Sequence, residues 1–145
     1  MKSQIILISS LLLSFCIPAL RNTQEISISK IDIHLSAFGV ESDDFPSIEG
    51  YIDFTNESSQ CTKSFYNPDF KGSTYQLSKE EIKKVLELLQ SSDLNKIKKE
   101  YTSNISDQPT STLVIHTSKG NYTFKDYGLQ GDHPLPDLYK IIYKF

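Results

Sequence analysis

Apolar and polar side chains alternate over short stretches of this chain, and this two-residue period constrains the fold more than any other feature. The alternation covers residues 31–36 and recurs over 47–54. Successive side chains of a strand point to opposite faces, so each stretch predicts a strand with one buried and one solvated face. Residues 56–59 predict a turn into a further strand over 60–66. The pattern is typical of an antiparallel meander.

A helix is predicted to begin after Ser78. In Ser78-Lys79-Glu80-Glu81 the hydroxyl can accept from the amide of Glu81 while the Glu81 carboxylate reaches back to the amide of Ser78, which forms a capping box. Ile82, Val85, Leu86 and Leu89 follow at the spacing of one helical face. Residues 91–93 break this pattern and predict the cap of a second short helix, whose Leu94 and Ile97 would face inward.

The rest of the chain predicts a polar loop over 101–109, a hairpin of strands 113–117 and 121–127, and a final helix over 137–143. Strands and helices are segregated rather than alternating. Such an order favours an α+β fold in two layers, an antiparallel sheet with its helices packed on one face.

Residues 1–19 predict a secretory signal peptide. Lys2 precedes an apolar run over 5–17, and the small residue Ala19 stands at a cleavable position. The run is shorter than the roughly 20 apolar residues that span a bilayer. We therefore expect an exported protein, periplasmic or secreted, that is cut near Ala19.

The two cysteines leave two questions open. Lipid attachment at Cys16 is the alternative to simple cleavage, but the bulky Phe15 directly before it disfavours a lipoprotein site. Cleavage near Ala19 removes Cys16, so the mature chain keeps Cys61 alone and cannot form an internal disulfide. Cys61 is then either a buried small hydrophobe or an exposed thiol able to pair between chains.

Residues 20–145 are long enough for one domain with a sizeable core, after a short polar leader, and too short for two. The full chain has a net charge of −3, and the loss of Lys2 makes it one unit more negative. An acidic chain argues against nucleic acid as a partner, because that affinity comes mainly from Lys and Arg at phosphates. We expect no transmembrane segment in the mature chain.

The predicted pattern resembles a group of small exported bacterial domains of unknown function. The features that carry the resemblance are a first strand that closes in Phe38-Gly39, the helix start at Leu77-Ser78-Lys79-Glu80-Glu81, a loop from Tyr101 to Asp107, and Asp126-Tyr127-Gly128 followed by Leu135 and Leu138. Together they cover most of the mature chain. The resemblance brings no known activity, so it implies the architecture alone.

Histidine is the natural place to look for metal or acid–base chemistry. His34 and His116 are predicted on the polar faces of neighbouring strands, and Asp32 could join them, but none of the three histidines lies in a ligand motif. No nucleophile motif occurs either. The sequence therefore predicts no catalytic residue, no metal site and no cofactor.

Tyrosine among carboxylates is the remaining signal. Tyr supplies a large contact area at low entropic cost, and acids steer a basic partner toward it. The predicted partner-binding residues are Asp43, Asp44, Glu49, Tyr51 and Asp53. They favour an exported, non-enzymatic protein-binding domain, of which an inhibitor or immunity-type protein in the bacterial envelope is one form. The alternatives are a small envelope enzyme using surface His and Asp residues, and a structural envelope component.

Overall fold

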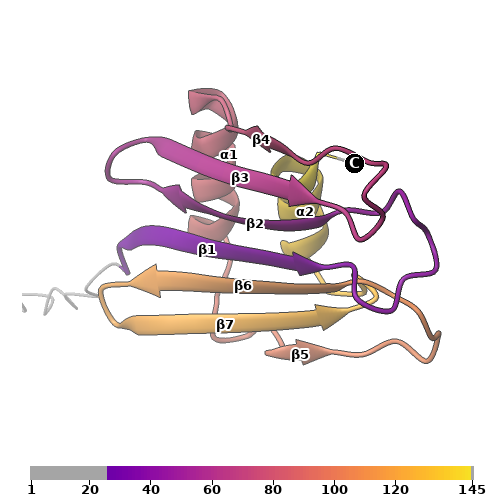
Figure 1. The fold of residues 1–145 in the computed structure, drawn as a ribbon. Helices are drawn as coiled ribbons and strands as arrows, with labels where there is room; N and C mark the ends of the chain where they lie inside the picture. The colour runs from indigo at the N-terminus through magenta and orange to yellow at the C-terminus, as the bar shows by residue number, and fades with distance from the viewer. Residues whose placement is uncertain (1–25, 145) are drawn as a thin grey trace, which may run out of the picture.

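The computed structural model describes residues 26–144 of the chain, so the predicted signal peptide and Cys16 lie outside the described residues. It contains a seven-stranded sheet and two helices (Figure 1). The elements are β1 (Ile28–Ser36), β2 (Ser47–Asp53), β3 (Ser58–Ser64), β4 (Ser73–Tyr75), α1 (Lys79–Gln90), β5 (Glu100–Tyr101), β6 (Thr110–Thr117), β7 (Gly120–Tyr127) and α2 (Leu135–Tyr143). The strands lie in the order β4-β3-β2-β1-β6-β7-β5.

Strand β1 lies at the centre of the sheet and pairs antiparallel with both β2 and β6. Ile31, Ile33 and Leu35 on this strand are at most 3% exposed, whereas Asp32 and His34 point to the solvated face. The predicted alternation is thus confirmed in β1. The buried side chains of the other strands follow the same two-residue period. A shift of one residue in the pairing register would move the apolar side chains of a strand to the solvated face, so the register is well specified.

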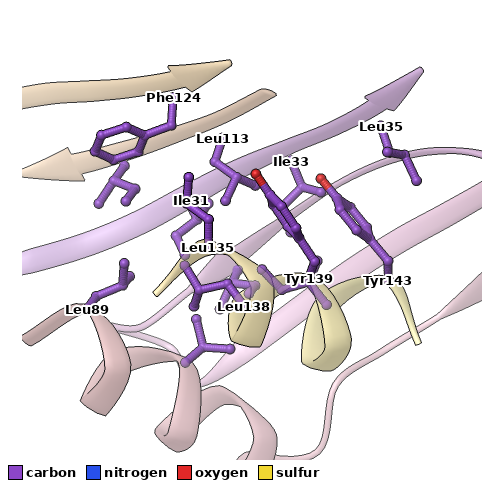
Figure 2. Packing of buried hydrophobic residues seen from close by; sticks show 14 of the residues in the cluster. Ile31, Ile33, Leu35, Leu89, Leu113, Phe124, Leu135, Leu138, Tyr139 and Tyr143 are labelled. Carbon is purple, nitrogen blue, oxygen red and sulfur yellow. The ribbon is translucent and has the colours of Figure 1, made fainter. Parts of the chain in front are cut away.

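Apolar side chains of both helices join those of the strands in one buried cluster. Figure 2 shows Leu89 of α1 and Leu135 and Leu138 of α2 among the residues of this cluster, with Tyr139 and Tyr143 directing their hydroxyl groups toward the strands. The two tyrosine rings stack with their centroids 5.5 Å apart. The fold is therefore broadly α+β, a mostly sheet domain with two helices.

The predicted start of α1 is confirmed in detail. The hydroxyl of Ser78 accepts a hydrogen bond of 3.2 Å from the amide of Glu81, and the Glu81 carboxylate accepts one of 2.7 Å from the amide of Ser78. Ile82, Val85 and Leu89 are buried, but Leu86 is only half-buried. The inward face of α1 is therefore narrower than the sequence pattern predicts.

The prediction of an antiparallel sheet is wrong at one edge, where β5 pairs parallel with β7 and makes the sheet mixed. This strand has two residues, too few to show any period, and its second residue, Tyr101, falls in the predicted polar loop. The prediction of a second short helix is also wrong. Asp93 begins a single turn, in which its carbonyl accepts a hydrogen bond from the amide of Lys96 and its carboxylate accepts one from the amide of Asn95. No helix follows this turn. Leu94 is nevertheless buried.

Within residues 26–144 neither helix is both long and apolar enough to cross a membrane.

Candidate functional site

A hollow of about 480 Å³ lies at one end of the sheet, between the β1–β2 loop (residues 37–46) and the β3–β4 loop (residues 65–72). Figure 1 shows both loops at the same end of the strands. Ser36, Ser47 and Ser64 line the hollow from the ends of the three adjacent strands β1, β2 and β3. Each serine continues the polar alternation of its strand, so the hollow opens on the solvated face of the sheet.

Two aromatic side chains at this hollow are almost fully exposed, Phe38 by 93% and Tyr66 by 100%. Phe38 lies at the tip of a turn in which the amide of Val40 donates a 3.0 Å hydrogen bond to the carbonyl of Ala37. Gly39 follows with φ of +87°, a conformation that favours glycine. The turn therefore holds the Phe38 ring in water, where it forgoes the roughly 1.5–3 kcal/mol that full burial of such a side chain contributes.

The two loops are tied to each other. The side-chain amide of Asn67 in the β3–β4 loop donates a 3.3 Å hydrogen bond to the Asp43 carboxylate in the β1–β2 loop, and the carbonyl of Asn67 accepts from the amide of Phe70. The rings of Phe65 and Phe70 pack with their centroids 5.6 Å apart. These contacts fix the walls of the hollow.

The two loops around the hollow carry a net negative charge. Asp43 is the one charged side chain in its lining; the β1–β2 loop contains Glu41, Asp43 and Asp44, and the β3–β4 loop contains Asp69 and Lys71. Among the described residues, Glu41, Asp43 and Asp44 form no ion pair, although Asp44 accepts a hydrogen bond from the Ser42 hydroxyl. Unpaired carboxylates around a cleft concentrate a negative potential there.

The five predicted partner-binding residues do not form one compact group. Asp43 lines the hollow and Asp44 follows it in the same loop, while Glu49 and Tyr51 lie farther along the solvated face of β2. Asp53 closes the same strand at its other end, six residues and therefore about 20 Å from Ser47. The structure thus brings Asp43 to the hollow and leaves Asp53 away from it.

Asp53 has a structural role that explains its presence. Its carboxylate accepts hydrogen bonds of 2.9 and 3.1 Å from the amides of Thr55 and Asn56, and one of 2.7 Å from the Asn56 side chain. These hydrogen bonds, first of all that of the Asn56 side chain, hold the pKa of Asp53 below its ordinary value. Asp53 therefore stabilises the turn between β2 and β3.

The other predicted residues of β2 already contact basic groups of β1. Glu49 lies 3.2 Å from Nδ1 of His34, and the Lys30 ammonium lies 5.5 Å from the ring centroid of Tyr51. Tyr51 is 37% exposed, much less than the two aromatic residues at the hollow. The middle of the solvated sheet face is thus internally paired, in contrast to the loops.

The predicted grouping of His34, His116 and Asp32 holds for two of its members. Nε2 of His116 lies 2.7 Å from the Asp32 carboxylate, whereas His34 pairs with Thr112, four residues and about 13 Å along β6 from His116. Burial opposes ionisation of Asp32, but hydrogen bonds from Lys30 and His116 outweigh it and lower the pKa of Asp32.

The residues around this pair, within the described range 26–144, bear on whether it belongs to a catalytic or metal site. No Ser, Thr or Cys side chain of residues 26–144 hydrogen-bonds the ring of His116. The same residues contain no cluster of three or more His, Cys, Asp or Glu side chains that could hold a metal ion.

Phe38 is the functional candidate that sequence reasoning missed. It directly follows an alternating strand, and the sequence pattern predicts it as the close of that strand. The signal that could have identified it is Gly39, because a glycine with positive φ marks a turn and places the residue before it at the tip.

Fold and site together define a small mixed-sheet α+β domain with an aromatic-rimmed acidic hollow at one end of the sheet. The chain belongs to the DUF6438 family, a domain of unknown function, which matches residues 43–145. This agrees with the predicted resemblance to an uncharacterised domain. The matched range includes the β3–β4 loop with Tyr66, whereas β1 and Phe38 precede it. No curated protein matches the chain, and no solved structure does.

Proposed function

We propose that this protein is an exported, non-enzymatic binding domain whose partner is another protein, in a bacterial envelope or outside the cell. An inhibitor or an immunity-type protein is one form that such a binding domain takes. The observation that carries the proposal is the exposure of Phe38 and Tyr66 on two loops that enclose a hollow. Exposed aromatic residues around a depression are typical of protein-contact surfaces, because their burial in a complex supplies most of the binding energy.

The proposed architecture is two-layered, with α1 and α2 both on the buried face of the sheet. Figure 1 supports it, since both helices are drawn behind the strands. The opposite face and the loops at its end are then left for a partner. Glu49 and Tyr51 extend the proposed surface from the hollow along β2, and Asp53 is excluded from it by its role in the turn.

Export rests on residues 1–19, where Lys2 precedes an apolar run that ends before Ala19. Intact-mass measurement of the exported protein tests it, with an expected N-terminus between residues 17 and 25. A diacyl-modified Cys16 would show lipid anchoring instead.

Site-specific crosslinking tests the binding function. A photoreactive phenylalanine analogue is placed at Phe38 in the full chain, and the matched control carries it at Lys119, an exposed residue of the β6–β7 turn at the opposite end of the strands. After illumination of the organism that produces the protein, we expect a defined protein adduct from position 38 and none from position 119. Equal yields from both positions, or no adduct from either, would contradict a protein-binding hollow.

Neither alternative gains a comparable observation. A nucleophile or metal ligands beside the His116–Asp32 pair would favour an envelope enzyme, and the described residues place neither there. A structural component would need a repeating contact surface. The proposal therefore stays with binding.

A further inference from the structure

We propose that the hollow binds a polypeptide segment in which an apolar or aromatic side chain is flanked by Lys or Arg. This inference rests on the proposed function and specifies the partner of the same site. It combines two independent features of the hollow, its exposed aromatic rim and its unpaired carboxylates.

The exposed aromatic rim of the hollow favours an apolar side chain as the anchor of the bound segment. Phe38 and Tyr66 present their rings from different loops, and Phe45 and Phe65 also line the hollow. The volume of about 480 Å³ falls within the roughly 300–1,000 Å³ typical of ligand clefts. An inserted apolar side chain would contact rings on both walls, and its burial would remove both exposed rings from water.

The negative charge of the β1–β2 loop favours basic residues beside the anchor in the bound segment. Asp43 lines the hollow and Glu41 and Asp44 stand in the same loop, whereas the facing loop contains Asp69 and a single basic residue, Lys71, which does not line the hollow. An acidic or phosphorylated segment would be repelled, whereas Lys or Arg beside the anchor would pair with carboxylates at the rim. A second copy of this chain is a poorer occupant, because its net charge of −3 opposes self-association.

The test is a selection from displayed random peptides at low salt. The full-chain protein serves as bait, and peptides that also bind the Phe38→Ser, Tyr66→Ser double variant are removed. We expect the remaining peptides to carry an aromatic or large aliphatic residue with Lys or Arg within two positions. Ile105→Ser is the matched control, because it removes an exposed apolar side chain of a different loop, and it should retain the selected peptides.

A selected peptide is then measured against a triple variant, Glu41→Gln, Asp43→Asn, Asp44→Asn. Asp43→Asn keeps an oxygen that can accept from Asn67. We expect a roughly 3- to 10-fold loss of affinity at low salt that disappears at high salt, as for exposed charge pairs at a rim. Glu80→Gln on the exposed side of α1 should leave affinity unchanged.

The outcomes separate this inference from the proposed function. Selected peptides that are acidic or lack a charge bias, yet depend on Phe38 and Tyr66, would overturn the basic partner and keep the binding function. A library without any peptide that distinguishes the wild-type protein from the double variant would overturn both. Self-association that is lost in the double variant would identify a second copy as the occupant and overturn the basic segment.

Discussion

The hydroxyl of Tyr139 donates a 2.9 Å hydrogen bond to Oδ2 of Asp126, and both side chains are buried. The same carboxylate accepts 2.8 Å hydrogen bonds from the amides of Gln130 and Gly131. Burial first, and then the neighbouring carboxylate, raises the pKa of Tyr139, so its hydroxyl stays a donor at every physiological pH. Three donors thus satisfy a buried carboxylate and join α2 to the end of β7.

Removal of this hydroxyl tests its contribution to stability. Tyr139→Phe leaves the ring in place but withdraws one of the three donors, and a hydrogen bond to a charged group contributes about 1.5–3 kcal/mol. We expect a loss of that size in the free energy of unfolding measured by denaturant titration. Tyr127→Phe is the control, because the Tyr127 hydroxyl accepts only a 3.3 Å hydrogen bond from the amide of Gln108. An equal loss in both variants would contradict a special role for Asp126.

The inward face of α1 gives a second stability test. Leu89 is 1% exposed and belongs to the main cluster, so Leu89→Ala should cost about 2–5 kcal/mol of the free energy of unfolding. Leu86→Ala, on a half-buried neighbour in the same helix, should cost clearly less. The two variants share helix propensity, which isolates burial as the cause. Equal losses would show that Leu86 is as buried as the sequence pattern predicts.

Elements with a strong local signal could be predicted from the sequence. Strand β1 alternates over its length, the start of α1 carries a complete capping box at Ser78, and Gly120 supplies the positive φ of the β6–β7 turn. Each signal arises within a few consecutive residues. The local sequence is therefore enough to predict these elements.

Features decided by distant contacts could not be predicted. Strand β5 forms because the chain passes beside β7, where Tyr101 pairs with Asp126 and is buried. The sequence of its two residues contains no signal that predicts this pairing. The same holds for the hollow, which requires two loops separated by the β2–β3 hairpin. Asp43 was predicted as a contact residue from its charge, but its place beside Phe38 and Tyr66 depends on the three-dimensional fold.

Gly50 of β2 has no room for a side chain beside the backbone of β3. A Cβ atom at this position would lie 2.1 Å from the carbonyl oxygen of Gln60 and 2.8 Å from the Cα of Cys61. Both obstacles are backbone atoms, so Gly50→Ala can be accommodated only if the strands separate. We expect a loss of about 1–3 kcal/mol in the free energy of unfolding. Gly120→Ala is the control, because nothing lies within 4 Å of a Cβ atom at that position. Its loss of stability reports the backbone strain of an alanine at φ of +117° without any steric clash.

Asp53 should make stability depend on pH. Its pKa is lower in the folded state than in the unfolded state, so its ionised form stabilises the fold above the unfolded-state pKa of about 4 and this contribution is lost as the pH falls through the folded-state value. Asp53→Asn keeps an oxygen for the amides of Thr55 and Asn56 but does not titrate. Its unfolding free energy should therefore fall less between pH 5 and 2 than that of the wild-type protein. Parallel pH curves would contradict the role of Asp53.

Cys61 should be inert in the folded protein. The structure resolves the alternatives in favour of a buried residue, since Cys61 is 0% exposed on the inward side of β3, and burial raises the pKa of its thiol. Native protein treated with N-ethylmaleimide at pH 7 should leave the Cys61 peptide unmodified in mass spectra, and denaturant should permit complete modification. Thr62→Cys is the matched control, because the adjacent side chain is exposed on the opposite face and its thiol should react in the native state. Equal rates at the two positions would show that β3 is not held in this register.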